Sequence, residues 1–184
     1  MIIGISGYAR SGKDTIADIL VDAGYQKVAF ADKLRESLLA LNPIVSFDTI
    51  SFQPIRYREI LTMLGYERAK TLYPEIRYLL QRLSTQVGRD LINKNIWVDL
   101  LVSDMDISDN SDFVISDCRF PNEAEAIKAA GGQVWRVVRP GIEAANQHIS
   151  EHALQGYEFD HVVFNDGTIE DLSSKVFNLI NYDK

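Results

Sequence analysis

Short apolar runs alternate along this chain with segments whose apolar residues recur at helical spacing. A nearly continuous apolar run is typical of a strand buried on both faces, whereas apolar residues three and four apart indicate one face of a helix. Strands are predicted at residues 1–6, 27–30, 112–117, 133–139 and 160–164. Helices are predicted at residues 13–23, 33–41, 57–64, 75–89, 96–105, 121–130 and 169–180, with residues 43–55 irregular and 140–157 a polar connection. This alternation predicts an α/β fold, a three-layer α/β/α arrangement around a central parallel sheet.

The loop between the first strand and the first helix carries a glycine-rich pattern with a lysine, Gly7-Tyr8-Ala9-Arg10-Ser11-Gly12-Lys13-Asp14-Thr15. Glycine reaches backbone angles that are closed to other residues, so successive N–H groups can turn inward around phosphate oxygens. The next helix points its positive end at the same place, and Lys13 adds a mobile charge. The pattern predicts a P-loop that binds a nucleoside polyphosphate, the alternative being an ordinary glycine-rich turn. Asp14 stands where Ser or Thr usually supplies a hydroxyl to magnesium.

Three further polar residues, Asp32, Asp117 and Arg139, follow predicted strands. Ligands of parallel sheets bind at the carboxyl ends of the strands, so these residues are expected near the P-loop. Asp117 is typical of an acid that orders magnesium, and capping of the helix after Pro121 is an equal alternative. Asp32 either anchors a second nucleotide or its magnesium, or caps the helix that begins at Lys33.

Basic residues recur after the predicted strands and on the middle helices. Arginine suits phosphate because its planar fork donates two parallel hydrogen bonds. A kinase needs such groups on both of its nucleotides, since two anions would otherwise repel each other. The favoured candidates are Arg35, Arg89 and Arg119, with Arg10, Lys33 and Arg139 in similar positions. Arg56, Arg77 and Arg136 are expected to be solvated surface residues.

Composition narrows the class of protein. The chain has 184 residues, 46% hydrophobic and 24% charged, which is enough for one α/β domain with a proper core. A formal net charge of −7 argues against duplex nucleic acid as a partner. The single cysteine, Cys118, excludes an intrachain disulfide. With no signal peptide and no apolar run that could span a bilayer, we expect no membrane contact and a cytoplasmic location.

Two polar segments near the carboxyl end carry weaker signals. His148 and His152 have helical spacing, but no cysteine or carboxylate pattern supports zinc, so a polar lid over residues 139–158 is the better interpretation. Asn165-Asp166-Gly167-Thr168 indicates a turn after the last strand. In a nucleotide-binding protein, the same turn lies where Asn165, Gly167 and Thr168 could contact an adenine.

Several stretches occur together in the order of one known family. They are the Gly-Lys-Asp ending of the P-loop, Phe30–Leu34, Leu80–Arg89, Asp117-Cys118-Arg119-Phe120-Pro121-Asn122-Glu123-Ala124, His148–Glu151 and Asn165–Thr168. On these motifs the chain resembles the phage-type deoxynucleoside monophosphate kinases, within the P-loop nucleoside monophosphate kinase group. Asp14 is then a mark of the family. Ser84-Thr85-Gln86 departs from the Gly-Thr-Glu that is frequent in the family, which leaves the base preference open.

The resemblance implies transfer of the γ-phosphoryl group of ATP to a deoxynucleoside 5′-monophosphate, with magnesium and a closing lid. It implies a P-loop NTPase-like single domain over residues 1–184, with an acceptor-binding helical region at about 33–106. Lys13, Arg89 and Arg119 would be catalytic. ATP would be held by Gly7, Arg10, Ser11, Gly12, Lys13, Asp14, Thr15, Arg139, Asn165, Gly167 and Thr168. The acceptor would be held by Asp32, Lys33, Arg35, Gln86, Arg89, Trp97 and Arg119, and magnesium by Asp14 and Asp117.

The sequence also leaves three alternative functions open. Another small P-loop kinase, such as a dephospho-CoA kinase, would use a different acceptor. A regulatory module would bind ATP without transferring phosphate, and a structural P-loop relic would not bind ATP. The middle helices are a candidate face for a homodimer. If the chain is phage-encoded, the expected location is the cytoplasm of the host.

Overall fold

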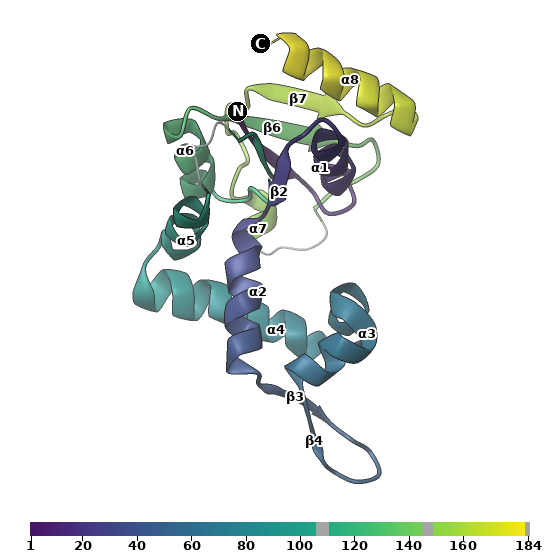
Figure 1. The fold of residues 1–184 in the computed structure, drawn as a ribbon, viewed down its shortest axis with the longest axis vertical. Coiled ribbons are helices and arrows are strands. Elements are labelled where there is room, and N and C mark those ends of the chain that lie inside the picture. The colour runs from purple at the N-terminus through teal and green to yellow at the C-terminus, as the bar shows by residue number, and fades with distance from the viewer. Residues whose placement is uncertain (106–110, 145–148, 183–184) are drawn as a thin grey trace. The chain divides into compact units, whose positions relative to one another are not determined.

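The computed structural model describes residues 1–105, 111–144 and 149–182. The chain divides into two compact units, each with its own core. The first, here called the sheet unit, consists of Met1–Phe30 with Leu101–Lys184. The second, the helical unit, is Ala31–Leu100. Figure 1 shows the helices and strands of each unit as a ribbon.

The sheet unit is built on five parallel strands in the order β2-β5-β1-β6-β7. Their bounds are β1 Ile2–Gly7, β2 Gln26–Val28, β5 Phe113–Ile115, β6 Gln133–Val138 and β7 His161–Phe164. Its helices are α1 Lys13–Asp22, α6 Pro121–Ala129, α7 Ile149–His152 and α8 Ile169–Tyr182. β1 lies in the middle of the sheet, so the P-loop that follows it is surrounded by neighbouring strand ends.

Alternate residues of β1 face opposite sides of the sheet and so set its two helical layers. Ile3 and Ile5 are fully buried in the cluster that includes Ile16 of α1 and Val176 of α8. On the other side, α6 contacts β1 and β6, and a Cβ on Gly4 would lie 2.4 Å from Ile127 Cδ1. The glycine therefore permits the close approach of α6. The predicted parallel sheet with helices on both faces is confirmed.

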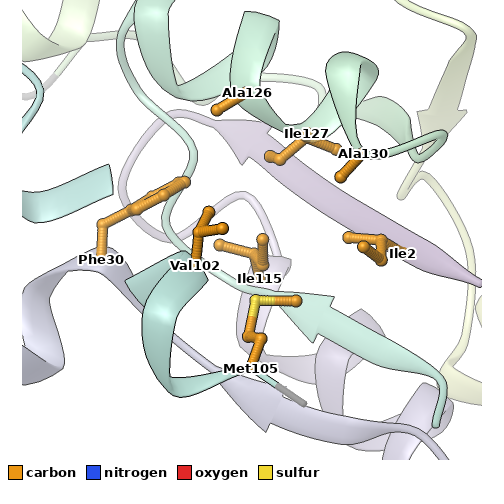
Figure 2. A pocket seen from close by; sticks show the side chains of 8 residues that line it. All are labelled: Ile2, Phe30, Val102, Met105, Ile115, Ala126, Ile127 and Ala130. Atoms are coloured by element: carbon orange, nitrogen blue, oxygen red, sulfur yellow. The ribbon is translucent and has the colours of Figure 1, made fainter. Parts of the chain in front are cut away.

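A small hollow lies on the α6 side of this sheet. Figure 2 shows that only apolar side chains line it, from Ile2, Phe30, Val102, Met105, Ile115, Ala126, Ile127 and Ala130. It offers no group that could pair with a phosphate, so it belongs to the packing of α6 against the sheet.

The helical unit contains the remaining elements. They are α2 Phe30–Leu41, β3 Ile44–Phe47, β4 Pro54–Arg56, α3 Tyr57–Leu72, α4 Pro74–Arg82, the π-helix η1 Leu83–Ile92 and α5 Ile96–Asp104. α2 begins, and α5 ends, in residues of the sheet unit. The core of the helical unit joins Leu38, Tyr57, Ile76 and Trp97 from four of its helices. Gly65, with φ of 70°, interrupts α3 with a kink.

One prediction for this unit was wrong, and a second was right about the helical residues but not about the kind of helix. Residues 43–55, predicted to be irregular, include the antiparallel hairpin β3-β4. The carboxylate of Asp48 closes its turn by accepting the N–H groups of Ile50 and Ser51 at 3.1 and 2.7 Å. The single helix predicted at residues 75–89 is an α-helix followed by a π-helix. Apolar periodicity failed here because it reports which side of a helix is buried and does not distinguish a local change in winding.

Candidate functional site

The loop between β1 and α1 has the backbone of an anion nest. Gly7, Arg10 and Gly12 have positive φ values of 155°, 66° and 104°. Such values turn successive N–H groups toward one side of the loop. Gly12 also occupies the position before α1, so the helix directs its free N–H groups and positive end at the same place.

Packing also crowds both glycines of the loop. A Cβ on Gly7 would lie 2.6 Å from Ser11 Oγ and 2.8 Å from the carbonyl oxygen of Val137. A Cβ on Gly12 would lie 2.4 Å from Asn165 Nδ2. Gly7 is therefore required both by backbone conformation and by space, whereas a side chain at Gly12, besides its positive φ, would require Asn165 to move.

Lys13 folds back over the loop that precedes it. Its side chain is buried, and Nζ donates a hydrogen bond of 2.8 Å to the carbonyl oxygen of Tyr8. The N–H of Ser11 donates to the same oxygen at 3.2 Å. The buried hydroxyl of Ser11 has no hydrogen-bond partner among the described residues. The loop thus holds a cation and a spare hydroxyl at the N-terminus of α1, an arrangement suited to an anion with several oxygens.

The turn after β7 supports this loop and caps the next helix. Asn165 Nδ2 donates a hydrogen bond of 2.9 Å to the carbonyl oxygen of Ser11. Thr168 and Asp171 cap α8 reciprocally, with the N–H of Thr168 2.9 Å from Asp171 Oδ2 and the N–H of Asp171 3.2 Å from Thr168 Oγ1. A Cβ on Gly167 would lie 2.5 Å from Asp171 Oδ2. These contacts hold the local structure of the turn together.

Asp117 follows β5, as predicted, at the carboxyl end of the sheet. Its Oδ1 accepts the N–H of Phe30, the first residue of α2, at 2.8 Å. Phe120 is the N-cap of α6 and Glu123 completes its capping box, while the alternative role of Asp117 as a cap stays a prediction. The buried carboxylate of Glu123 accepts the N–H groups of Arg119 and Phe120 at 2.8 and 3.0 Å. Asp117 and the backbone of Arg119 are thus fixed by separate contacts on one short segment.

The other predicted metal ligand, Asp14, faces solvent and a lysine. Its side chain is 83% exposed, and its Oδ1 lies 3.5 Å from Lys27 Nζ. Asp18 Oδ1 lies 2.9 Å from the same nitrogen. Within residues 1–105, 111–144 and 149–182, no three His, Cys, Asp or Glu side chains gather as a metal-binding group. That finding is compatible with magnesium, which uses one or two protein carboxylates together with phosphate oxygens and water.

Arg136 was predicted to be solvated, and the structure corrects this. The guanidinium stacks 4.7 Å from the ring of Tyr8 and 5.6 Å from that of Phe159. Its Nη1 donates to Ser6 Oγ at 3.3 Å. β6 pairs with β1 so that Arg136 lies opposite Ser6, just before the P-loop. The position of Arg136 on the strand next to the P-loop strand is the feature that distinguishes it from solvated arginines, and the identity of the residue alone does not reveal this position.

In the helical unit, the predicted acceptor residues of α2 pair with one another. Arg35 Nη1 lies 2.8 Å from Asp32 Oδ1, and its guanidinium stacks 4.8 Å from the ring of Tyr66. Lys33 Nζ lies 3.0 Å from Glu36 Oε2. These contacts hold Arg35 in a defined orientation, while the charges of Asp32 and Lys33 are balanced by neighbours on the same helix.

A second candidate arginine, Arg89, lies on the π-helix η1. Arg89 Nη1 donates to Ser84 Oγ at 2.6 Å. Trp97 Nε1 donates to the carbonyl oxygen of Ser84 at 3.0 Å, and the indole covers Gly88. Gln86 is exposed and accepts a hydrogen bond of 2.9 Å from Arg82 Nε. Ser84, where the family frequently has glycine, therefore supplies a hydroxyl that orients Arg89.

The remaining predicted residues are placed as follows. Arg10 is exposed on the P-loop, Thr15 is half-buried in the first turn of α1, and Arg139 is exposed directly after β6. His148 lies outside the described residues.

A family model described as deoxynucleotide monophosphate kinase matches residues 48–176. The chain belongs to this family. Membership confirms the resemblance drawn from the motifs. The P-loop, Asp117 and the π-helix all lie in a member of the deoxynucleotide monophosphate kinase family, although their individual roles stay predictions.

Curated relatives point to the same family. The deoxynucleotide monophosphate kinase of Escherichia phage RB69 is 39% identical over 57% of this chain and 44% of its own. That of Enterobacteria phage T4 is 35% identical over 58% of this chain and 47% of its own. The matched part therefore spans less than half of these two phage proteins. A putative deoxynucleotide monophosphate kinase of Acanthamoeba polyphaga mimivirus is 29% identical and is covered to 96%.

A solved structure supports the fold. Dephospho-CoA kinase from Campylobacter jejuni has a TM-score of 0.52 and 13% identity, over 98% of this chain and 96% of that chain. At this identity the likeness concerns the fold alone, and it confirms the predicted P-loop kinase-like α/β architecture. Within the described residues, every helix is too short or too polar to traverse a bilayer.

Proposed function

We propose that this member of the family transfers the γ-phosphoryl group of ATP to a deoxynucleoside 5′-monophosphate, yielding ADP and the deoxynucleoside diphosphate. The observation that carries the proposal is the P-loop, with its glycines at positive φ and the buried Lys13 at the start of α1. The family match supports the choice of acceptor over dephospho-CoA.

The sheet unit is proposed to bind the donor. Its P-loop residues hold the ATP phosphates, and Lys13 exchanges the carbonyl oxygen of Tyr8 for phosphate oxygens. Arg119 supports charge that develops on the transferred group, because its backbone is fixed by Glu123 at the end of β5. Asn165, Gly167, Thr168 and Arg139 are the remaining proposed donor residues, and residues 139–158 the proposed lid that excludes water.

Magnesium fits the donor end through the carboxylate chemistry available there. When bound, magnesium would supply positive charge that neutralises part of the charge of the nucleotide phosphates. Asp117 is the stronger candidate to hold it, directly or through water, because it stands at a strand end. Asp14 is the second candidate, and its approach would exchange the Lys27 ion pair for the metal.

The helical unit is proposed to bind the acceptor. Arg35 and Arg89 are the proposed phosphate ligands, since a neighbouring side chain orients each guanidinium and the planar fork suits phosphate oxygens. Asp32, Lys33 and the exposed Gln86 are the proposed contacts to the sugar or base. Trp97 acts here by holding Ser84 and Gly88. Reaction then depends on alignment and charge neutralisation, with no covalent enzyme intermediate.

A coupled assay of ADP release tests this function. Purified protein with ATP and magnesium is offered each common deoxynucleoside and ribonucleoside monophosphate, and dephospho-CoA in parallel. Turnover with at least one deoxynucleoside monophosphate is expected. Turnover with dephospho-CoA alone would favour the other kinase, and ATP binding without transfer to any acceptor would favour a regulatory module.

Matched arginine variants test the acceptor half. Arg89→Lys keeps the charge but loses the fork, so the KM for the acceptor should rise about tenfold or more while the KM for ATP changes little. Arg77→Lys, on the exposed surface of the same unit, is the control and should change neither. Equal effects of the two substitutions would contradict the role of Arg89.

A further inference from the structure

Asn165 is attached to two different parts of the sheet unit. Its backbone N–H extends the pairing of β7 with β6 by donating to the carbonyl oxygen of Val138 at 2.8 Å. Its side-chain Nδ2 donates to the carbonyl oxygen of Ser11 at 2.9 Å, across 154 positions of sequence. A carbonyl oxygen can only accept, so the amide must present its NH₂ group to the P-loop.

This bond sets the direction of one N–H of the nest. The carbonyl of Ser11 and the N–H of Gly12 belong to the same planar trans peptide, so they point in opposite directions. With the carbonyl held by Asn165, the N–H of Gly12 is directed away from Asn165. A rotated peptide would instead turn a carbonyl oxygen into the nest and repel phosphate. Gly12 has no Cβ, so the rotation meets less steric resistance there than at another residue.

The turn that carries Asn165 is itself well supported. Lys175 Nζ of α8 lies 2.8 Å from the carbonyl oxygen of Phe164 and 2.5 Å from Asp166 Oδ1. The reciprocal cap of Thr168 and Asp171 fixes the other end of the turn. The missing Cβ of Gly12 provides the room into which Asn165 Nδ2 fits. Asn165 thus connects the phosphate loop to β7 and, through the turn, to α8.

We infer that Asn165 is a positioning residue for the P-loop, which holds the Ser11–Gly12 peptide in the orientation that binds phosphate, whatever base the nucleotide carries. The inference rests on the proposed function, since it concerns the same donor site. It differs from the adenine contact expected from the sequence, in which Asn165 would distinguish ATP from other nucleotides.

Binding measurements with and without a base separate the two roles. Calorimetry with magnesium compares ATP, GTP and inorganic tripolyphosphate on the wild type, Asn165→Ala and Asn165→Leu, the last being a donor-free side chain of similar size. All three ligands should bind about three- to tenfold more weakly to both variants, the effect of one lost hydrogen bond. Loss for ATP with unchanged tripolyphosphate binding would overturn the inference in favour of a base contact. Unchanged binding of all three would also overturn it.

A control variant and a second readout protect this test. Ser174→Ala, at an exposed position of α8 whose hydroxyl donates to the carbonyl oxygen of Glu170 in the same helix, is the control and should leave tripolyphosphate binding within about twofold of wild type. In ligand-free protein, the amide NMR signal of Gly12 should move in Asn165→Leu and stay in place in Ser174→Ala; an unmoved Gly12 signal in Asn165→Leu refutes the inference. Wild-type protein that binds neither ATP nor tripolyphosphate would refute the proposed function, while the Gly12 signal still reports on the bond.

Discussion

Gly88 in the π-helix offers a sharp test of the helical unit, because alanine there has no room. A Cβ would lie 2.7 Å from Trp97 Cζ2 and 2.9 Å from both Cε2 and Nε1. These atoms belong to a rigid ring that is only 5% exposed, so the whole indole must move. That movement also strains the bond from Trp97 Nε1 to the carbonyl oxygen of Ser84.

The expected cost follows from three terms. Overpacking a buried site costs about 1–3 kcal/mol, and a weakened hydrogen bond adds about 1 kcal/mol. The better helix propensity of alanine offsets about 0.5–1 kcal/mol. Gly88→Ala should therefore lower the free energy of unfolding by about 1–3 kcal/mol, measured by urea denaturation followed by circular dichroism. A gain of about 0.5–1 kcal/mol, as in an open helix, would refute the reasoning.

A double-mutant cycle identifies the ring as the cause. Trp97→Leu removes the three contacted atoms, so Gly88→Ala should cost at least about 1 kcal/mol less in that background than in the wild type. Equal cost in both backgrounds would show that the crowding lies elsewhere. Because Arg89 follows Gly88 directly, Gly88→Ala should also raise the KM for the acceptor more than the KM for ATP.

Three further predictions concern single groups. Lys13→Ala should lower turnover by at least about 100-fold, which is the usual effect of losing one hydrogen-bond donor to the transition state, while circular dichroism shows an intact fold. Near-wild-type turnover would exclude the P-loop role. Burial raises the pKa of the Cys118 thiol well above its usual value, so iodoacetamide at pH 8 should label it at least about tenfold faster in urea than in native protein, and equal rates would contradict its burial. Burial raises the pKa of Asp160, but hydrogen bonds from Lys128 and the N–H of Val134 outweigh burial and leave this pKa lowered. The difference in free energy of unfolding between wild type and Asp160→Asn, measured by urea unfolding, should be full at pH 7 and shrink as the pH falls through that lowered pKa. A difference that widened toward low pH would contradict the sign of the shift.

The features that can be read from neighbouring residues were predictable. The P-loop and its flanking strand and helix follow from glycine, lysine and a change in apolar period within 22 residues. Strands alternating with helices led directly to the parallel sheet, because such strands need crossover connections. The stretch from Asp117 to Ala124 was specific enough to indicate the family, since it joins a strand end to a helix start.

Contacts that depend on the path of the chain were decided by the tertiary structure. The bond from Asn165 to Ser11 joins residues 154 apart, and the stacking of Arg136 on Tyr8 requires β6 to lie beside β1. The indole of Trp97 lies against Gly88 of the π-helix, a contact that no local period records. Sequence patterns therefore determined which residues form the phosphate loop, and the packing of distant strands and helices decided what holds that loop in shape.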